Sequence, residues 1–390
     1  MPPNTPVLQA LQPNETPNPA EVLRQWPART PLAVRWSNQP DAGAQVVIGI
    51  PVETRTARTG PELESLLREL QPRQRTPHGG GWFGWISYDA GECFEPASRA
   101  AKPRALADRT WPLASFHRIE SPVELETGAG KSGGVGPAGE ILNAIGTRRD
   151  RDSDPHYSLD SIDAAKNRDQ YIAGVHRIIE YIRAGDAYQV NLAHRLSTPF
   201  SGSTRGLFAD LVEAAQPWHG GYFEADGYAL ASLSPELFLE ADLHTGEVRT
   251  RPMKGTRPYT DATDAAARLD LDSSTKDRAE LAMIVDLMRN DLGRVCDLGS
   301  VRVEQERCIE KHASGVLQST ATVAGRLRRG TTLLDLLRAT FPPGSVTGAP
   351  KIRAMQIIDE LEPVRRGPYC GTMLWIGDDG KLEANVMIRT

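Results

Sequence analysis

The 390-residue sequence predicts an α+β fold, and three stretches indicate it. Apolar residues recur at intervals of three and four across residues 172–182, as in an amphipathic helix that Gly185 would end. Apolar and polar side chains then alternate across 188–196, as in a strand whose polar face, including Gln189, could line a cavity. A second helix is expected over 275–292, with Thr275 as its N-cap. Helices and strands therefore interleave along the chain.

The other elements follow in chain order. A strand is predicted at 45–52 and a helix at 61–70, which together form a small αβ lead-in. Three glycines then open an aromatic strand within 78–96, whose large side chains are expected to pack on both faces of a sheet. Two further strands are predicted at 227–233 and 237–241.

The composition changes between Glu124 and Pro155, where glycine, alanine, serine and charged residues dominate. Such a stretch contains few large apolar side chains to bury, so an exposed linker or insertion is expected there. The sequence is accordingly divided into an N-terminal portion of the fold at 1–123, this linker at 124–155, and a catalytic core at 156–390.

Composition excludes several classes of protein. A net charge of -5, with 24% charged and 39% hydrophobic residues, indicates no general affinity for nucleic acid or membranes. The sequence has no apolar run of the ~20 residues that span a bilayer, and residues 1–30 lack the apolar centre of a signal peptide. The cytoplasm is therefore the expected compartment. The four cysteines have no Cys-x-x-Cys spacing, so neither a zinc knuckle nor a disulfide framework is predicted.

Six ordered motifs resemble those of the chorismate-binding family, which includes the anthranilate, aminodeoxychorismate, isochorismate and salicylate synthases. They are GDAYQVNL (185–192), SPELF (234–238), RPMKGTRP (251–258), KDRAELAMIVDLMRND (276–291), GSVTGAPK (344–351) and NVMIRT (385–390). The resemblance covers about 168–390, and residues 78–89 match more loosely. It implies two large antiparallel sheets packed face to face with outer helices, as in anthranilate synthase component I, and a chorismate site in the cleft between the sheets.

Chorismate carries two carboxylates, and the sequence offers candidate groups for both. The glycine-rich turn before Pro350 predicts free backbone N–H groups at a helix N-terminus, although an ordinary turn would look the same. By resemblance, Tyr369 and Arg389 hold the other carboxylate, a task that suits a guanidinium fork. The substrate-binding residues implied by the resemblance are Gln189, Thr256, Gly344, Thr347, Gly348, Tyr369, Gly371 and Arg389.

The resemblance also implies the proton-transfer and metal-binding residues. Glu236 matches a general acid, which is needed because hydroxide is a poor leaving group. His312 matches a pocket histidine, and both an acid–base role and simple polar packing fit it. Glu280 matches a Mg2+ ligand, whereas periodicity alone favours a partly exposed helix glutamate. Mg2+ is the cofactor implied.

Two positions distinguish among the reactions of the family. Isochorismate and salicylate synthases carry a lysine base where Gln189 stands, and glutamine cannot accept the proton of an attacking water. Lys254 stands where anthranilate synthases typically show alanine and aminodeoxychorismate synthases show lysine. Its implied role is a covalent bond to ring C2 while the C4 hydroxyl leaves. Desolvation or a nearby cation such as Arg257 would have to lower its pKa from the ordinary ~10.4.

The expected reaction is therefore amination of chorismate at C4 to 4-amino-4-deoxychorismate. No Gly-x-Cys-x-Gly nucleophile is present, so a separate glutamine amidotransferase subunit is expected to supply ammonia. Family members continue beyond the equivalent of Thr390 into further metal ligands, so the 390-residue chain is expected to bind Mg2+ and chorismate poorly by itself. The alternatives are an anthranilate synthase component I and, in another class, a non-catalytic chorismate-binding scaffold.

Overall fold

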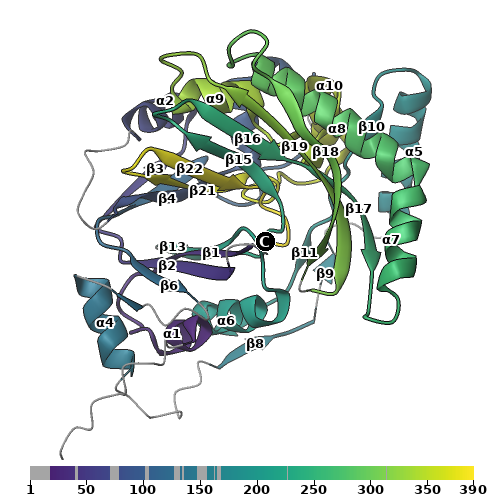
Figure 1. The fold of residues 1–390 in the computed structure, drawn as a ribbon. Coiled ribbons are helices and arrows are strands. Elements are labelled where there is room, and N and C mark those ends of the chain that lie inside the picture. Colours follow the sequence, from purple (N-terminus) through teal and green to yellow (C-terminus); the bar gives the residue numbers. More distant parts are fainter. Residues whose placement is uncertain are drawn as a thin grey trace, which may run out of the picture.

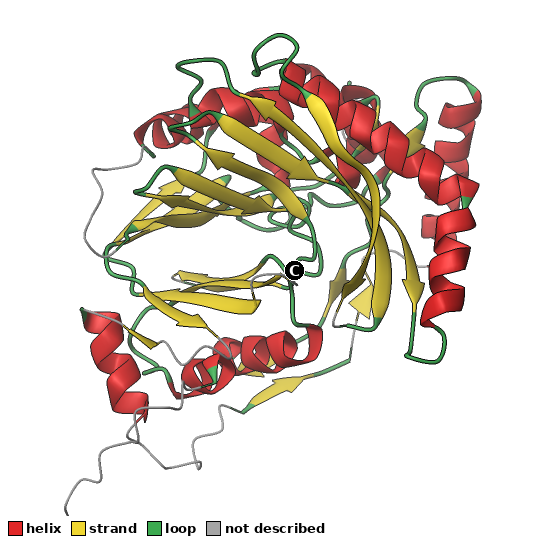
Figure 2. Ribbon diagram, in the orientation of Figure 1, coloured by secondary structure: helices red, strands yellow, loops and turns green. Residues whose placement is uncertain are grey.

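Two antiparallel sheets of unequal size lie face to face in the computed structural model (Figure 1). The structure describes residues 18–39, 43–70, 79–101, 105–126, 132–133, 136–146, 156–161, 163–164, 168–225, 227–312 and 314–390. Helices cover the outer face of each sheet (Figure 2). This is the architecture that the family resemblance implied.

The smaller sheet has six strands in the order β14-β13-β1-β2-β6-β7. Its strands are β1 (Ala33–Gln39), β2 (Gly43–Gly49), β6 (Val123–Glu126), β7 (Ser132–Gly133), β13 (Gly220–Ala225) and β14 (Tyr228–Ser232). Three helices lie outside it, namely α1 (Pro19–Gln25), α4 (Pro137–Gly146) and α6 (Thr204–Ala215). Apolar side chains of these helices and strands form one continuous core, which includes Leu23, Phe208 and Tyr222.

The larger sheet has ten strands in the order β17-β19-β16-β15-β22-β21-β4-β5-β3, with β18 also paired to β19. Its strands are β3 (Glu53–Ala57), β4 (Gly81–Ile86), β5 (Ala114–Ile119), β15 (Leu237–Asp242), β16 (Glu247–Arg251), β17 (Met253–Pro258), β18 (Arg302–His312), β19 (Val316–Arg326), β21 (Thr372–Gly377) and β22 (Lys381–Asn385). The helices that pack on it include α2 (Gly60–Glu69), α8 (Thr275–Gly293), α9 (Leu333–Thr340) and α10 (Lys351–Leu361).

Strand β4 confirms the expectation of an aromatic strand buried on both faces. All six of its residues are buried. Trp82 and Ile86 join the core under the outer helices, whereas Phe83 and Trp85 join a third apolar cluster with residues of both sheets. Alternate side chains of a strand point to opposite faces, so one short segment helps to hold two layers together.

The segment 124–155 differs from its expected exposure in the part that the structure describes. Strand β6 pairs with β2, and Leu125 is fully buried. The side chains of Leu142 and Ile145 on α4 join the core of the smaller sheet. Glycine and alanine dominate the composition, but a few apolar residues at helical spacing suffice to dock α4.

The division at this segment is not a boundary between compact domains. Strands β13 and β14 follow the segment in sequence, yet they complete the smaller sheet beside β1. Strands β3, β4 and β5 precede it, yet they lie in the larger sheet beside β21. Both sheets therefore need strands from both sides of the segment.

The helices predicted over 172–182 and 275–292 are present, with small corrections. Helix α5 (Arg168–Arg183) ends before Gly185, whose φ of 82° suits glycine. Ile178 on this helix is buried, whereas Ile172 and Ile182 stay more than a third exposed. Helix α8 begins at Thr275, but its N-cap is Ser274, whose side chain accepts a hydrogen bond from the Asp277 N–H. The predicted strand 188–196 is formed only at β10 (Gln189–Val190) and at Leu196 in β11 (Leu196–Ser197).

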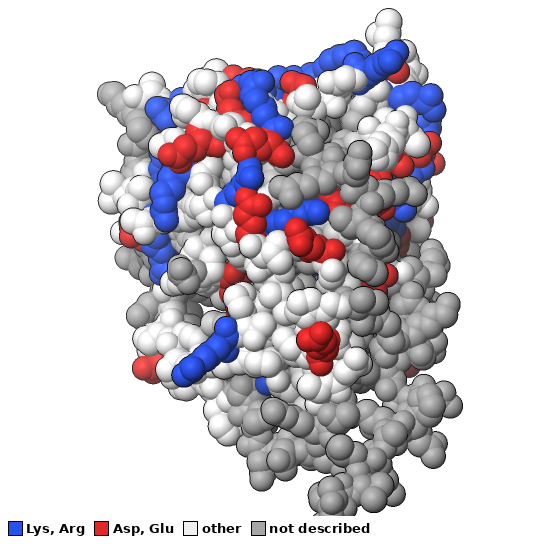
Figure 3. Space-filling view, turned by 90° about the vertical axis from the view of Figure 1, so that its left-hand side faces the viewer, with Lys and Arg blue, Asp and Glu red and all other residues white. Residues whose placement is uncertain are grey.

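The surface matches the balanced composition. On the face seen in Figure 3, acidic and basic side chains of the described residues lie intermixed. Within the described part of the chain, no helix is long and apolar enough to cross a bilayer. The four cysteines form no disulfide bonds.

Candidate active site

Glu236 and Lys254 meet at one end of the larger sheet. Glu236 immediately precedes β15, and Lys254 is the second residue of β17. The Lys254 Nζ donates a hydrogen bond to the backbone carbonyl of Ser345 at 3.1 Å, and the Ser345 side chain bonds the Glu236 carboxyl group. The register of both strands shifts near these residues. Such irregularities change the direction in which side chains point from a strand. They are common at the edges of sheets and beside active sites.

The environment of Glu236 favours its protonated form. Its residue is 4% exposed, and this burial raises the pKa of the carboxyl group to about 7. The Ser345 hydrogen bond, the charge of Lys254 and the Met253 N–H act in the opposite direction but do not outweigh burial. A carboxylic acid that keeps its proton near neutrality can protonate a leaving oxygen.

Arg257, by contrast, is not a free cation beside Lys254. Its guanidinium pairs with Asp270 and, at 2.9 Å, with Asp277. Two carboxylates therefore balance its charge, so Arg257 is not the unpaired cation that was expected near Lys254.

The glycine-rich turn is built from tightly packed backbone. Gly348 has a φ of 145°, and a Cβ at this position would lie 2.1 Å from the Gln189 carbonyl oxygen. Thr347 is fully buried, and its hydroxyl lies 3.2 Å from the Gly344 carbonyl, to which it donates. The Thr347 N–H also bonds the Gly344 carbonyl. These groups thus have structural tasks, and their contact with substrate stays a prediction. Pro350 is the N-cap of α10 and not its first helical residue.

Gln189 lies beside this turn because β10 pairs with β20 (Gly348–Ala349). Its side-chain Oε1 is buried and has no hydrogen-bond partner within the described residues. A buried acceptor without a partner is costly, so this oxygen is available to a ligand. Asn191 donates from Nδ2 to the Ser345 carbonyl, whereas Arg195 pairs with Asp108 elsewhere. Only part of the predicted polar face therefore reaches the site.

His312 is held as a neutral imidazole. Its ring stacks on Trp218 with 3.8 Å between ring centroids. Burial lowers the pKa of His312 to about 4, and the positive charges of Arg389 and Arg251 act in the same direction. Its Nε2 has no hydrogen-bond partner in the described part of the chain. A neutral histidine can form hydrogen bonds but carries no positive charge. His312 is therefore better suited to a polar contact than to an ionic one.

The remaining predicted substrate contacts are less concentrated. Tyr369 is 40% exposed and lines a separate cavity of about 430 Å3. Thr256 and Arg389 are exposed, and the Gln318 amide donates to the Thr256 hydroxyl at 3.3 Å. A Cβ on Gly371 would lie 2.1 Å from the Ile86 carbonyl oxygen, so the backbone packing requires glycine there. Direct binding of chorismate by these four residues stays a prediction.

The described residues do not form a complete metal site. They contain no group of three or more His, Cys, Asp or Glu side chains that could hold an ion. Glu280 is about one-third exposed and pairs with Lys276 at 3.7 Å. Asp277, one turn earlier on α8, is neutralised by Arg257. Glu280 could therefore offer a single carboxylate to an ion.

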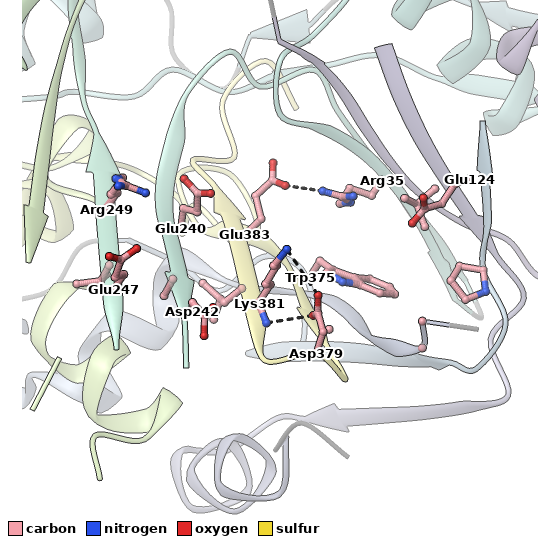
Figure 4. A pocket seen from close by; sticks show the side chains of 18 residues that line it. Arg35, Glu124, Glu240, Asp242, Glu247, Arg249, Trp375, Asp379, Lys381 and Glu383 are labelled. Atoms are coloured by element: carbon pink, nitrogen blue, oxygen red, sulfur yellow. Dashed lines mark hydrogen bonds and ion pairs between the residues drawn. The ribbon is translucent and has the colours of Figure 1, made fainter. Parts of the chain in front are cut away.

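A second cavity between the sheets lies apart from these groups. It has a volume of about 480 Å3, and the described residues that line it include none of the predicted site residues. Figure 4 shows Glu383 and Arg35, two of the residues that line it, joined directly by an ion pair. Glu383 accepts hydrogen bonds from Arg35 at 2.5 Å and from His219 at 2.9 Å. Burial alone would raise the pKa of Glu383, but these partners lower it to about 2. The Glu383 cluster thus links the two sheets.

Some residues of the site were not predicted from the sequence. Ser345 stands inside the GSVTG motif, yet nothing in the motif shows that it touches both Glu236 and Lys254. Trp218 lies far from His312 in sequence, and no local pattern predicts their stacking. Spatial proximity of distant segments was the missing information.

The chain is similar to known enzymes that use chorismate. The chain is 43% identical over 229 residues to aminodeoxychorismate synthase component 1 from Klebsiella aerogenes, covering 58% of this chain and 50% of that protein. The chain thus spans about half the length of that relative. It is also 34% identical over 340 residues to an anthranilate synthase component 1 from Haloarcula marismortui, covering 80% of this chain and 68% of that protein.

A solved structure extends the likeness to the fold. The anthranilate synthase component I from Streptococcus pneumoniae has a TM-score of 0.74 and 26% identity, over 93% of this chain and 84% of that one. The model of the family described as chorismate binding enzyme matches residues 32–390. The chain therefore belongs to the chorismate-binding enzyme family.

Proposed function

We propose that this chain is an aminodeoxychorismate synthase subunit that converts chorismate and ammonia to 4-amino-4-deoxychorismate, a precursor of 4-aminobenzoate for folate synthesis. The observation that carries the proposal is the convergence of Lys254 and Glu236 on Ser345. A candidate nucleophile and a candidate acid thus occupy one small region. The similarity to the Klebsiella aerogenes protein supports the same reaction.

The first step uses both side chains. Lys254 gives up a proton to solvent and forms a bond from Nζ to ring C2, and the two ring double bonds shift toward C4. The C4–O bond breaks while Glu236 donates its proton, so water leaves. The raised pKa of Glu236 supplies that proton near neutral pH.

The second step reverses the shift. Ammonia forms a bond to C4, the double bonds return, and the C2–N bond to Lys254 breaks. The lysine leaves with its electron pair, and the ammonium group at C4 returns a proton to the Glu236 carboxylate, which restores the acid. Amination thus occurs at C4 and not at C2. His312 lies on the same sheet and is neutral at neutral pH. It can therefore form a hydrogen bond with the substrate but does not act as a general acid.

Two further components belong to the proposal. Ammonia would come from a separate glutamine amidotransferase subunit, and ammonium salts should replace it in an assay. Mg2+ is the proposed cofactor, with Glu280 as one ligand to the ion and chorismate supplying others. Mg2+ commonly binds through one or two protein carboxylates together with substrate oxygens and water.

The test is product identification by chromatography and mass spectrometry after incubation with chorismate, ammonium and Mg2+. We expect aminodeoxychorismate from the full-length protein, which serves as the parent, and none when Mg2+ is chelated. Lys254→Ala should lower its formation by at least about 1000-fold, because the covalent route is lost. Lys381→Ala, which removes a lysine that is 73% exposed, is the matched control and should leave the rate unchanged.

Other outcomes favour the alternatives. Anthranilate from the parent protein would assign the chain to the anthranilate synthases, an alternative that the Haloarcula marismortui relative favours. Chorismate binding without any product, under all ammonium and Mg2+ conditions, would favour a non-catalytic scaffold. Unchanged turnover in Lys254→Ala would exclude the covalent route.

A further inference from the structure

A buried ion pair lies directly behind the candidate site. The Arg366 and Glu362 side chains are 3% and 4% exposed. Arg366 donates from Nε to Glu362 at 3.0 Å and from a terminal nitrogen at 2.7 Å, as a two-pronged fork. Its guanidinium also lies over the ring of Tyr88, 4.5 Å from the centroid. Such a pair is rigid because both its charges and its geometry are satisfied.

The pair also bonds two other segments of backbone. Arg366 donates to the Val346 carbonyl at 2.9 Å and to the Asn191 carbonyl at 2.7 Å. Glu362 accepts from the Ala193 N–H at 2.7 Å. One ion pair therefore connects the segment 191–193 to the turn that contains Val346.

These two segments are the ones that carry the site. Val346 lies between Ser345, which bonds Lys254, and Thr347, whose carbonyl accepts from the Asn191 N–H. Gln189, with its unpartnered oxygen, is only two residues before Asn191. A shift of the Val346 carbonyl would move Ser345, and with it the relative positions of Lys254 and Glu236.

We infer that Arg366 and Glu362 are positioning residues that hold the Ser345 turn against the 189–193 segment, so that Lys254 and Glu236 keep their reactive geometry. The inference rests on the proposed function. Neither side chain needs to touch chorismate, because both act through the backbone. Lysine cannot replace Arg366, since a single ammonium cannot bond Glu362 twice and two carbonyls as well.

The test compares Arg366→Lys with a matched variant. Arg118→Lys alters another buried pair, in which Arg118 and Asp378 are both 2% exposed and bond at 2.6 and 2.7 Å. That pair joins β5 to the turn after β21, and neither residue lies in the candidate site. Both variants should lower the unfolding temperature. Only Arg366→Lys should lower kcat for aminodeoxychorismate, by roughly 100-fold, since small displacements of catalytic groups have effects of that size.

The readouts separate positioning from stability. We expect kcat to fall much more than KM rises in Arg366→Lys, and Glu362→Gln to show the same pattern if the lysine variant does not fold. Equal kcat values, within twofold, for the folded Arg366→Lys and Arg118→Lys proteins would overturn the inference.

Failure of the proposed function is distinguishable. If the parent protein forms no aminated product, the readout becomes the affinity for chorismate, measured by calorimetry on the parent and both variants. A loss of about tenfold or more in Arg366→Lys alone supports the inference, and equal affinities in all three proteins overturn it.

Discussion

The two sheets differ in what they bury. The smaller sheet buries large apolar side chains under α1, α4 and α6, as at Phe208 and Tyr222. The larger sheet has a similar apolar layer, but it also buries Glu236 and His312 at or next to strand ends. Within the described residues, all three predicted catalytic side chains lie on or next to strands of the larger sheet. We therefore expect the smaller sheet to serve mainly for packing and the larger sheet to carry the catalytic groups.

The contact between the sheets is not purely apolar. Phe83 and Phe223 lie in the shared cluster, with ring centroids 6.5 Å apart. The Glu383 cluster adds an ionic link, because Glu383 lies on the larger sheet and Arg35 on the smaller. The smaller sheet, held in this way, can orient the larger sheet without supplying a reacting group itself.

The largest effect is expected from a substitution in the core of the smaller sheet. Phe208→Ala removes a fully buried ring that stacks on Tyr222, with 5.2 Å between the ring centroids. We expect the free energy of unfolding to fall by about 3–5 kcal/mol, from lost burial and the cavity left behind. Denaturant unfolding measures this change. The value of kcat/KM per folded molecule should stay within twofold of the parent, and a tenfold loss would contradict the division between the sheets.

A smaller free-energy change is expected for a substitution at the larger sheet. Glu236→Gln keeps the shape of the side chain but removes its proton, so kcat should fall by roughly 100-fold, or about 2.7 kcal/mol. In the parent, kcat/KM should decrease as the pH rises through about 7, where Glu236 ionises. The variant should lack this alkaline limb. An identical pH profile would show that another group is the acid.

Glu236 should also affect stability with pH. Burial raises its pKa in the folded protein from 4.5 to about 7, so its contribution is fully present below about pH 4.5 and is lost as the pH rises through 7. The loss is on the order of 3 kcal/mol. Thermal unfolding measured between pH 5 and pH 8 should show this loss of stability in the parent and not in Glu236→Gln.

The smallest effects are expected at two helix N-caps, one beside each sheet. Ser203 caps α6 outside the smaller sheet, accepting from Gly206 N–H at 3.0 Å, and Ser274 caps α8 beside β17. Replacing either with alanine should lower the free energy of unfolding by about 1 kcal/mol. Only Ser274→Ala should also lower kcat/KM, by up to about fivefold. Equal kinetics in the two variants would mean that the start of α8 does not influence the site.

Local patterns were sufficient for much of the fold. Residues 168–183 and 275–293 form helices because apolar side chains recur at helical spacing, and residues 81–86 form a strand buried on both faces. The family motifs predicted the two-sheet architecture. The family resemblance named Lys254 and Glu236, and the structure brings both to Ser345, while their catalytic roles stay predictions.

Tertiary packing determined the rest. Segment 124–155 contributes β6 and α4 to a core, because strands and helices distant in sequence offer them partners. Ser345, Trp218 and Arg366 contact residues far along the chain, and no local pattern predicts those contacts. Sequence patterns report which face of an element is apolar. They do not report which elements meet, because that depends on the free energy of the whole folded arrangement.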